Sequence, residues 1–451
     1  MSYAVAIQEL NRMAPELHTQ PGTARRKFSL DEIRILLAAL GNPHQKFPSI
    51  LIAGTNGKGS TASTLASILV ASGLRTALYT SPHLERPNER IKINGQDISN
   101  DAFASRYFHI HDTAEALVRN GELPQFPSFF ETLTAMAFLH FAEEAVEIAV
   151  LEVGMGGRLD ATNIVEPLLS IVTDISLDHT EWLGSTIAEI AREKAGILRP
   201  NGILVTLPQH PEANQVLGEV AVSLNVRGVS AAPCMPTIGF QKTGAGDSYP
   251  VEVLGSEMEV ASPLHGPHQH RNVALAIAAA AELATNHALP ITPASIAAGI
   301  RSTRWPGRFE ILSTSPSGGS APMQWVLDVA HNPAGAWALR ASLREIDPAP
   351  RTLVFSCLKD KPLAELAQIL FPLFEQIVFA PIASPRATPM QDLLAAAAQT
   401  GTAAHAAETV AGALDLAQKL AREHDPPQVV VSGSVYLVGE ARSLLLQQAA
   451  Q

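Results

Sequence analysis

The sequence predicts an α/β protein with a P-loop-type, mostly parallel sheet in its N-terminal domain and a smaller Rossmann-like α/β domain at its C-terminus. Three observations support this prediction. Short apolar runs are typical of buried strands, segments with helical apolar spacing lie between them, and a glycine-rich turn directly follows the first run. Strands that alternate with helices favour a parallel sheet covered on both faces.

The first part of the chain carries most of these signals. Strands are expected at residues 49–53, 75–79, 147–153, 168–173, 202–207 and 251–254, and helices at 3–17, 29–40, 58–72, 129–143 and 272–284. Asp31 and Glu32 stand near the start of one of these helices, where acidic side chains complement the helix dipole.

A stretch rich in Ser, Gly and Pro at residues 312–323 separates two α/β patterns, and we interpret it as the domain seam or a surface loop beside it. Further strands are expected at 325–329, 351–356, 375–380 and 427–432. We therefore predict a first α/β domain at residues 1–308. A second α/β domain at residues 309–451 should follow it.

Composition narrows the classes of function. The chain has 451 residues, of which 46% are hydrophobic, and its formal net charge is −11. An acidic protein of this kind lacks the basic stripe expected of a nucleic-acid-binding protein. Cys234 and Cys357 lie far apart, the start lacks a signal peptide, and the most apolar stretch, 273–281, is too short to span a membrane. We expect a cytoplasmic protein, monomeric by default, that binds neither nucleic acid nor membranes.

The glycine-rich turn is the clearest chemical motif. It reads Gly54-Thr55-Asn56-Gly57-Lys58-Gly59-Ser60 and stands between a strand and a helix. Such a turn presents backbone N–H groups and a helix N-terminus to phosphate, and Lys58 adds a full positive charge. The motif departs from the usual nucleotide loop because Gly59 separates the Lys from the Ser. The alternative is a tight turn with an exposed Lys. No Asn-Lys-x-Asp motif supports a guanine-nucleotide switch.

Several further motifs stand in order along the chain. They are Thr80-Ser81-Pro82-His83-Leu84, Asn88-Glu89-Arg90-Ile91, Leu151-Glu152-Val153-Gly154-Met155-Gly156-Gly157-Arg158-Leu159-Asp160-Ala161-Thr162-Asn163, Asp178-His179-Thr180, Arg192-Glu193-Lys194-Ala195-Gly196-Ile197, His268-Gln269-His270-Arg271-Asn272, Trp305-Pro306-Gly307-Arg308-Phe309 and Asp328-Val329-Ala330-His331-Asn332-Pro333. Together they resemble the bacterial dihydrofolate synthase/folylpolyglutamate synthase family, a branch of the Mur ligases. The resemblance runs from about residue 28 to Gly439. It implies that the domain at residues 1–308 binds ATP and the pterin and that residues 309–451 form the ligase domain on the glutamate side.

The resemblance implies ATP-dependent ligation of L-glutamate to dihydropteroate and to the γ-carboxyl of reduced folates. A carboxylate is a poor acyl donor, so the γ-phosphoryl of ATP must first convert it to an acyl phosphate that an amine then attacks. The protein must neutralise and align the phosphoryl groups and exclude water. Lys58 and Mg²⁺ would carry the neutralising charge, and the whole phosphate loop from Thr55 to Ser60 would bind ATP.

The family places Ser81, Glu152 and His179 on Mg²⁺, with Ser60 close by, and the resemblance implies two such ions. Glu152 ends a predicted strand, so its carboxylate should emerge at the edge of the sheet where ligands bind. The alternatives are a surface acid for Glu152 and an ordinary packed or capping residue for His179. In the family the Lys that matches Lys194 is carbamylated by CO₂ and helps to hold the second ion. The alternative for Lys194 is a solvated helix lysine. Lys58, Lys194, His179 and Glu152 are thus the predicted catalytic residues.

The other end of the nucleotide should meet later motifs. By resemblance, Asn272 lies near the adenine, Arg308 meets phosphate, Asp328 lies at the ribose, and His331 lies close by. A hinge beside Arg308 would bring it onto the phosphates only when the domains close. The alternative for Arg308 is a surface ion pair.

The pterin-linked acid should lie against loops of the first domain. The resemblance assigns Leu159, Asp160 and Ala161 to its binding loop, with Asp160 accepting N–H groups of the pterin. Ser128 and Phe130 match positions beside the ligand, where an aromatic ring can stack on a flat one. The alternative for the Phe129-Phe130 pair is helix core. Phe28 and Ser29 are expected to add a further wall.

Three other functions stay open. The first is a folylpolyglutamate synthase without the first-glutamate activity. The second is another Mur-type amide ligase, although only 53 residues precede Gly54, too few for the nucleotide-sugar domain of peptidoglycan ligases. The third is an inactive relative that binds ATP and forms no product.

Overall fold

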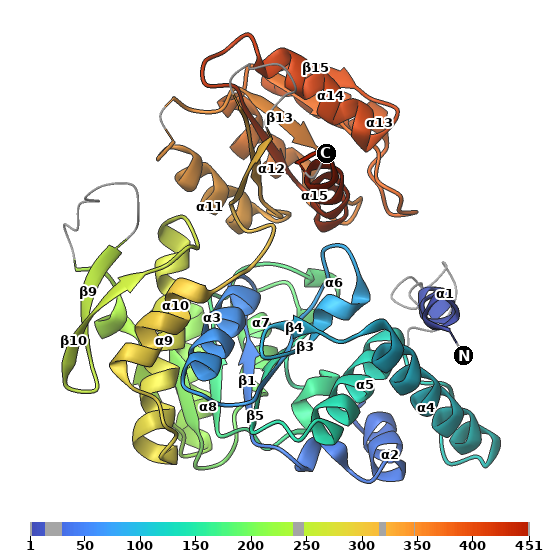
Figure 1. Ribbon diagram of the computed structural model, residues 1–451, viewed down its shortest axis with the longest axis vertical. Coiled ribbons are helices and arrows are strands. Elements are labelled where there is room, and N and C mark those ends of the chain that lie inside the picture. The colour runs from blue at the N-terminus through green and yellow to red at the C-terminus, as the bar shows by residue number, and fades with distance from the viewer. Residues whose placement is uncertain (1, 14–28, 238–247, 315–321, 347, 450–451) are drawn as a thin grey trace. The chain divides into compact units, whose positions relative to one another are not determined.

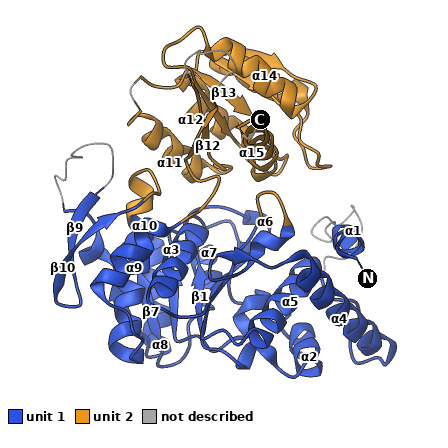
Figure 2. Ribbon diagram, viewed as in Figure 1, with its two compact units in different colours: residues 1–82, 87–262, 271–303 blue, residues 83–86, 263–270, 304–451 orange. Residues whose placement is uncertain are grey.

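The computed structural model describes residues 2–13, 29–237, 248–314, 322–346 and 348–449 of the chain. It divides into two compact units, shown in Figure 2. The first consists of residues 1–82, 87–262 and 271–303, and the second of residues 83–86, 263–270 and 304–451. Phe28 lies outside the described residues.

The first unit is built on a sheet whose strands, among the described residues, follow the order β4-β3-β2-β5-β1-β6-β7-β8. Its strands are β1 (Ser49–Ala53), β2 (Thr76–Tyr79), β3 (Ile91–Ile93), β4 (Gln96–Asp97), β5 (Ile148–Glu152), β6 (Leu169–Val172), β7 (Ile203–Thr206) and β8 (Arg227–Ser230). The six strands from β2 to β8 in this order are parallel, and β3 and β4 extend the sheet as antiparallel strands. The predicted mostly parallel α/β fold is confirmed.

Helices cover both faces of this sheet (Figure 1). They are α1 (Tyr3–Met13), α2 (Asp31–Ala39), α3 (Lys58–Ala71), α4 (Asn100–Arg119), α5 (Phe129–Glu143), α6 (Thr180–Leu183), α7 (Ile187–Ala195), α8 (Pro211–Ser223), α9 (Pro267–His287) and α10 (Pro293–Ser302). A hairpin of β9 (Ser248–Val253) and β10 (Ser256–Ala261) adds a small separate sheet.

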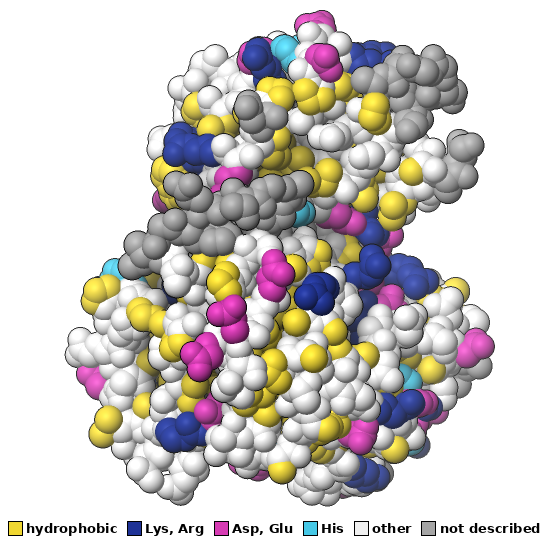
Figure 3. All heavy atoms as spheres, turned by 60° about the vertical axis from the view of Figure 1, so that its left-hand side comes forward, with side chains coloured by type: hydrophobic (Ala, Val, Ile, Leu, Met, Phe, Trp, Pro, Cys, Tyr) yellow, Lys and Arg dark blue, Asp and Glu magenta, His cyan; other side chains and the backbone are white. Residues whose placement is uncertain are grey.

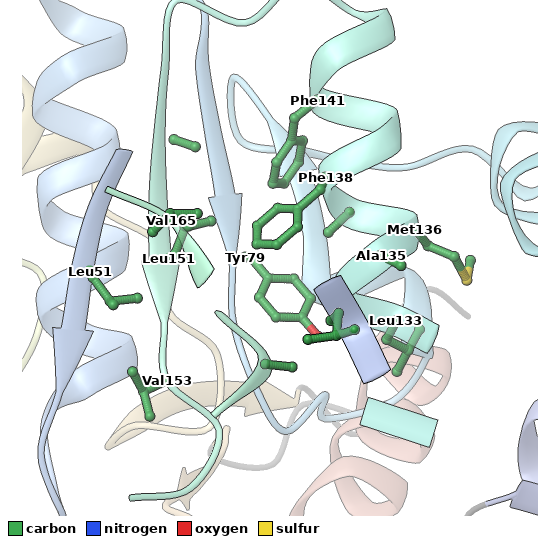
Figure 4. Packing of buried hydrophobic residues seen from close by; sticks show 14 of the residues in the cluster. Leu51, Tyr79, Leu133, Ala135, Met136, Phe138, Phe141, Leu151, Val153 and Val165 are labelled. Atoms are coloured by element: carbon green, nitrogen blue, oxygen red, sulfur yellow. The ribbon is translucent and has the colours of Figure 1, made fainter. Parts of the chain in front are cut away.

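Alternate residues of each buried strand feed two hydrophobic cores. Leu51 of β1 packs with α1, α2, α4 and α5 on one face, and Ile52 packs with α3, α9 and α10 on the other. Figure 4 shows the first core, where Phe138 and Phe141 of α5 point toward Tyr79 and the strands. Burial on both faces is the reason that β1 reads as one continuous apolar run.

The second unit contains a sheet of order β11-β12-β16-β13-β14-β15, counted over the described residues. Its elements are β11 (Glu310–Thr314), β12 (Met323–Leu327), α11 (Pro333–Leu343), β13 (Thr352–Phe355), α12 (Leu363–Leu370), β14 (Gln376–Phe379), α13 (Met390–Thr400), β15 (Ala403–Ala406), α14 (Val410–Ala421), β16 (Gln428–Ser432) and α15 (Val435–Ala449). All strands but β11 are parallel. The helices α11, α12 and α13 pack on one face, and α14 and α15 pack on the other.

The segment predicted as a seam, 312–323, differs from that expectation at both ends. Residues 312–314 belong to β11 and Met323 begins β12, while 315–321 lie outside the described residues. The strand β11 pairs antiparallel with β12, so this segment connects two strands of the second sheet. The Ser, Gly and Pro content of residues 312–323 gave no indication that both ends of the segment belong to strands.

Three observations concern the surface charge, the thiols and the apolar character of the helices. Acidic and basic side chains both occur on the face drawn in Figure 3, and no broad area of that face is basic alone. Cys234 is buried in the first unit and Cys357 in the second. No helix in the described part of the chain is both long enough and apolar enough to cross a bilayer.

Candidate active site

The phosphate loop connects β1 to α3, and its glycines are required by close approach. Gly57 has φ 86°, and a Cβ atom there would collide with the side-chain amide of Asn272 on α9. A Cβ atom at Gly54 would collide with the hydroxyl of Thr173, which follows β6. The sequence therefore needs glycine at both positions to bring three chain segments together. The predicted strand, turn and helix are confirmed here.

Two lysines converge on one carbonyl oxygen of this loop. The Lys58 Nζ donates to the Gly54 carbonyl at 3.0 Å and to the Thr55 carbonyl at 3.2 Å. The Lys194 Nζ, near the end of α7, donates to the same Gly54 oxygen at 2.8 Å. The sequence predicted both residues for the site, and the structure brings them together in the first unit.

Lys194 is buried, with 4% of its surface exposed. Burial lowers the pKa of its ammonium to about 7, and repulsion from Lys58 acts in the same direction. This environment excludes the alternative of a solvated helix lysine. A group with such a pKa is partly a neutral amine near pH 7, and a neutral amine is nucleophilic.

Glu152 is also buried, with 4% exposure, and ends β5 beside the exit of β2. Its Oε2 accepts the backbone N–H of Ser81 at 3.0 Å. This contact joins two of the predicted metal ligands and excludes a surface acid. A buried carboxylate next to a serine offers the oxygen donors that a hard cation such as Mg²⁺ prefers.

His179 stands directly before α6, at its N-cap position, with left-handed backbone torsions, φ 50° and ψ 38°. Its side chain is 43% exposed, and its Nε2 lies 4.0 Å from the carboxylate of Asp178. Within the described ranges, no group of three or more His, Cys, Asp or Glu residues gathers closely enough to hold a metal. A cation at this site would therefore need the hydroxyls of Ser60 and Ser81 or atoms of the ATP as further ligands.

The carboxylate of Asp160, which is predicted to accept N–H groups of the pterin, is hydrogen-bonded within its own loop. Its Oδ1 accepts the backbone N–H of Thr162 at 3.0 Å and the Thr162 hydroxyl at 2.6 Å, and its Oδ2 accepts the Met155 N–H at 2.9 Å. Burial raises the pKa of this carboxyl, although these bonds oppose the change. The carboxylate therefore holds its own loop closed, which is a structural task that leaves little acceptor capacity for a pterin.

The same loop is fixed to the helix that carries Lys194. The Arg158 N–H donates to the Glu193 carbonyl at 2.8 Å, and the Asn163 side chain donates to the Gly196 carbonyl at 3.0 Å. Leu159, partly exposed, and the buried Ala161 belong to this loop. The predicted acid-binding loop and the predicted catalytic lysine thus form one continuous piece of structure.

Ser128 and Phe130 flank this loop from α5. The Ser128 hydroxyl and the Glu131 carboxylate form a capping box at the start of that helix. The Ser128 side chain therefore stabilises the helix terminus, and the spacing Ser-x-x-Glu could have revealed this role. The Phe130 ring lies against Gly154 and 6.0 Å from the Tyr79 ring, so it packs partly on the first core. Ser29 donates to Asp31 at 2.9 Å beside the start of α2.

Three predicted nucleotide-binding residues belong to the second unit. The Asp328 carboxylate, after β12, accepts the N–H of Phe309 and the N–H of Ala330, each at 2.9 Å. Burial raises its pKa to about 6, and the positive charge of Arg308 opposes this change. The His331 Nδ1 lies 2.8 Å from the Val329 carbonyl. These residues form one cluster within that unit.

The sequence did not reveal that Thr173 and Asp174 bind the phosphate loop through hydrogen bonds. The Asp174 carbonyl accepts the N–H groups of Thr55 and Asn56 at 2.8 and 3.3 Å, and the Thr173 hydroxyl donates to the Asn56 carbonyl at 2.7 Å. The predicted phosphate contacts therefore fall to the N–H groups from Gly57 onward, because those of Thr55 and Asn56 are engaged. Polar residues directly after a buried strand were a signal, but the pairing of β6 with β1 was not foreseen.

Comparison with known proteins gives matches along almost the whole chain. Residues 52–280 match the family model "Mur ligase middle domain", and residues 307–435 match "Mur ligase, glutamate ligase domain". The dihydrofolate synthase/folylpolyglutamate synthase of Mycobacterium tuberculosis is 34% identical, over 96% of this chain and 92% of its own length. The chain belongs to the dihydrofolate synthase/folylpolyglutamate synthase branch of the Mur ligases.

Solved structures agree with this assignment. The folylpolyglutamate synthase of Mycobacterium tuberculosis complexed with ADP and AMPPCP superimposes with a TM-score of 0.86 at 33% identity, over 98% of this chain and 99% of the other. An "FPGS-AMPPCP-folate complex" gives a TM-score of 0.82 at 31% identity, over 99% of this chain and the whole of the other. The predicted family and fold are confirmed.

Some archaeal relatives of this ligase are much longer. The probable bifunctional folylpolyglutamate synthase/dihydropteroate synthase of Haloferax volcanii is 34% identical over 98% of this chain, which spans 50% of that protein. The chain therefore corresponds to about half the length of such relatives.

Proposed function

We propose that this ligase joins L-glutamate to dihydropteroate, forming dihydrofolate, and to the γ-carboxyl of reduced folates, forming polyglutamates. The observation that supports the proposal most directly is the phosphate loop with Lys58 and Lys194 on its Gly54 carbonyl, in a chain similar over 98% of its length to an enzyme bound to ADP and AMPPCP. The folate part rests on the names of the relatives and on the complex that contains folate.

The proposed reaction has two steps. A carboxylate oxygen of the acceptor attacks the γ-phosphorus of ATP, the bond to the β-phosphate oxygen breaks, and ADP leaves. The amine nitrogen of glutamate then attacks the acyl carbon of the acyl phosphate, phosphate leaves, and the new amide loses the extra proton to solvent. The protein contributes by aligning the reactants and stabilising the transferred charge.

Several predicted site residues of the first unit have a task in this scheme. Lys58 and the N–H groups at the start of α3 would bind the phosphates, because the helix N-terminus favours anions. Glu152, with Ser81, Ser60 and His179, would hold Mg²⁺, which supplies further neutralisation of phosphate charge when bound. Leu159 and Ala161 would form a wall for the acceptor, while Asp160 keeps their loop in shape.

We also propose that Lys194 carries a carbamate. The ammonium would first lose one proton to solvent; the neutral amine nitrogen would then attack the carbon of CO₂ and release a second proton, which leaves a carbamate anion able to assist a second Mg²⁺. Support comes from the burial of the amine beside the phosphate loop and from its pKa of about 7. With ¹³C-bicarbonate, the wild type should give a carbamate signal in ¹³C NMR that Lys194→Ala lacks. Near-normal turnover by Lys194→Ala would refute its catalytic role.

Ligation with separate acceptors tests the main proposal. Purified protein would receive ATP, Mg²⁺ and labelled L-glutamate, with dihydropteroate, tetrahydrofolate or no acceptor. Label in product with both acceptors is the expected result. Label with tetrahydrofolate alone would assign the polyglutamate activity only, as in the relative named folylpolyglutamate synthase from Lacticaseibacillus casei, which is 34% identical. No label with either acceptor would refute the proposal. A cytoplasmic location and a monomeric state remain predictions.

A further inference from the structure

The phosphate loop of the first unit is gripped along its first half by the segment that leaves β6. Besides the bonds to the Asp174 carbonyl, the Thr55 hydroxyl donates to the Ser176 carbonyl at 3.0 Å and accepts the Ser176 N–H at 3.1 Å. The Asn56 side chain reaches the Ser176 hydroxyl at 3.3 Å. The position of the loop therefore depends directly on the position of residues 173–176.

The helix α9 packs closely against the second half of the phosphate loop. The side-chain amide of Asn272 fills the space where a Cβ atom of Gly57 would stand. Asn272 is 5% exposed and faces the loop at its turn into α3. A shift of α9 by a fraction of an ångström toward the loop would therefore push against the backbone that precedes Lys58.

One ion pair joins these two supports. The Arg271 guanidinium, next in sequence to Asn272, grips Asp174 with Nε at 3.0 and 2.9 Å from its two carboxylate oxygens and with Nη2 at 2.6 Å from Oδ1. The same Nη2 donates to the Pro208 carbonyl at 2.9 Å. Asp174 thus binds the phosphate loop through its backbone and α9 through its side chain.

We propose that the Asp174–Arg271 pair is a positioning device for ATP: it holds the phosphate loop and Asn272 at a fixed separation. This inference rests on the proposed ATP-dependent function. Neither side chain is assigned to the nucleotide or to the reacting atoms. A planar fork on a carboxylate fixes direction as well as distance, which a lysine in place of Arg271 would not reproduce.

The solvent exposure of the Arg271 and Asp174 side chains allows an effect on ATP binding to be distinguished from an effect on stability. The Arg271 and Asp174 side chains are 28% and 43% exposed, and ion pairs at such sites contribute little to the free energy of unfolding. Loss of the pair should therefore leave the fold intact and act mainly on nucleotide binding. A pair that was only structural would give a small change in stability and no selective change toward ATP.

The first unit offers a matched control. The Arg75 guanidinium donates to the Glu144 carboxylate at 2.6 Å and to the Glu144 carbonyl at 2.7 Å, with side chains 43% and 40% exposed. Arg75 directly precedes β2, so it lies at the opposite end of the strands from the phosphate loop. Arg75→Gln removes a comparable pair without touching either support of the loop.

The experiment compares Asp174→Asn, Arg271→Gln, Arg271→Lys and Arg75→Gln in the full chain. Asp174→Asn and Arg271→Gln should raise the KM for ATP roughly tenfold and weaken binding of AMPPCP, measured by calorimetry, by a similar factor, because the misplaced loop loses alignment. The kcat and the KM for glutamate should stay within about twofold of the wild type. The KM for ATP and the AMPPCP affinity of Arg271→Lys should fall between those of the wild type and those of Arg271→Gln. Arg75→Gln should match the wild type in both.

The exchange Asp174→Arg with Arg271→Asp restores opposite charges and should recover part of the lost affinity. Unchanged AMPPCP binding in both single variants, or equal weakening in Arg75→Gln, would overturn the proposal. Because calorimetry needs no ligation product, failure of the folate activity in the wild type would refute the proposed function and leave this test in force.

Discussion

Each unit of the molecule contains a buried aspartate that follows a strand and fastens a loop, and the two are held in different ways. Asp160 of the first unit is surrounded by neutral donors, namely backbone N–H groups and the Thr162 hydroxyl. Asp328 of the second unit accepts two backbone N–H groups and also lies in the field of Arg308. Burial raises the pKa of both carboxyls.

The difference separates a structural carboxylate from one that responds to a charge. The hydrogen-bond donors to Asp160 lie within its own loop and should change little during the reaction, whereas its charge also interacts with that of Lys194. Arg308 is predicted to meet phosphate, and any movement of this arginine would change the field at Asp328. Asp160 therefore fixes the conformation of its loop, and the pKa of Asp328 depends on the position of Arg308.

The largest effect is expected from Asp160→Ala. The variant leaves the part-buried N–H group of Met155 and the buried N–H group of Thr162 without these acceptors, which should lower the free energy of unfolding by about 3 kcal/mol. Urea unfolding of the first unit checks this value. Asp160→Asn keeps one acceptor oxygen and should lose less. Equal stability of the Ala variant and the wild type would remove the distinction between the two aspartates.

Asp328 should give the second effect, through pH. Its folded pKa of about 6 lies above the ordinary value of 3.8, so the native state binds this proton more tightly than the unfolded state. The contribution is fully present below pH 3.8 and is lost as pH rises through 6. Relative to Asp328→Asn, the wild type should lose roughly 2–3 kcal/mol between about pH 4 and pH 7. A constant difference between the two proteins across this range would contradict the assignment.

Thr162→Val tests the neutral donors of Asp160 by removing one of them. Because the Thr162 N–H still donates, the free energy of unfolding should fall by about 1 kcal/mol. Thr162→Ser retains the hydroxyl and serves as the control. A loss as large as that of Asp160→Ala would show that the hydroxyl, rather than the backbone, closes the loop.

The smallest effect concerns Arg308→Gln. Loss of the guanidinium removes the interaction that lowers the pKa of Asp328, so the inflection in the stability–pH curve should move to higher pH. The same pH series measures it, with Arg344→Gln, an arginine at the end of α11, as a control of equal charge change. An unmoved inflection would mean that the pKa of Asp328 depends on its backbone donors and burial and not on Arg308.

The sequence predicted the strand, phosphate loop and helix from Ser49 to Ala71 almost to the residue, because continuous apolar runs and required glycines report local geometry directly. Among the elements that it missed are the helices α4, α8 and α10 and the strands β3, β4, β8 and β10. The strand β15, Ala-His-rich and without β-branched residues, carries no strand signal of its own and forms by pairing with β14.

Roles of side chains were harder to predict than their positions. Lys194 and Glu152 are buried, as expected of residues in a site, and their catalytic and metal-binding roles stay predictions. Asp160 and Ser128 were predicted as ligand contacts, but their oxygens bond to backbone groups of their own loops. Only coordinates decide between these uses, since a carboxylate or hydroxyl accepts from a ligand and from a main chain equally well.

The two cysteines give the molecule a built-in reporter. Burial raises the pKa of Cys234 to about 11 and raises that of Cys357 above its ordinary value, so in the native state neither thiol is readily ionised or reached by a reagent. One thiol lies in each unit. The rates at which an alkylating reagent modifies Cys234 and Cys357 therefore record how often each unit opens, without any label being introduced.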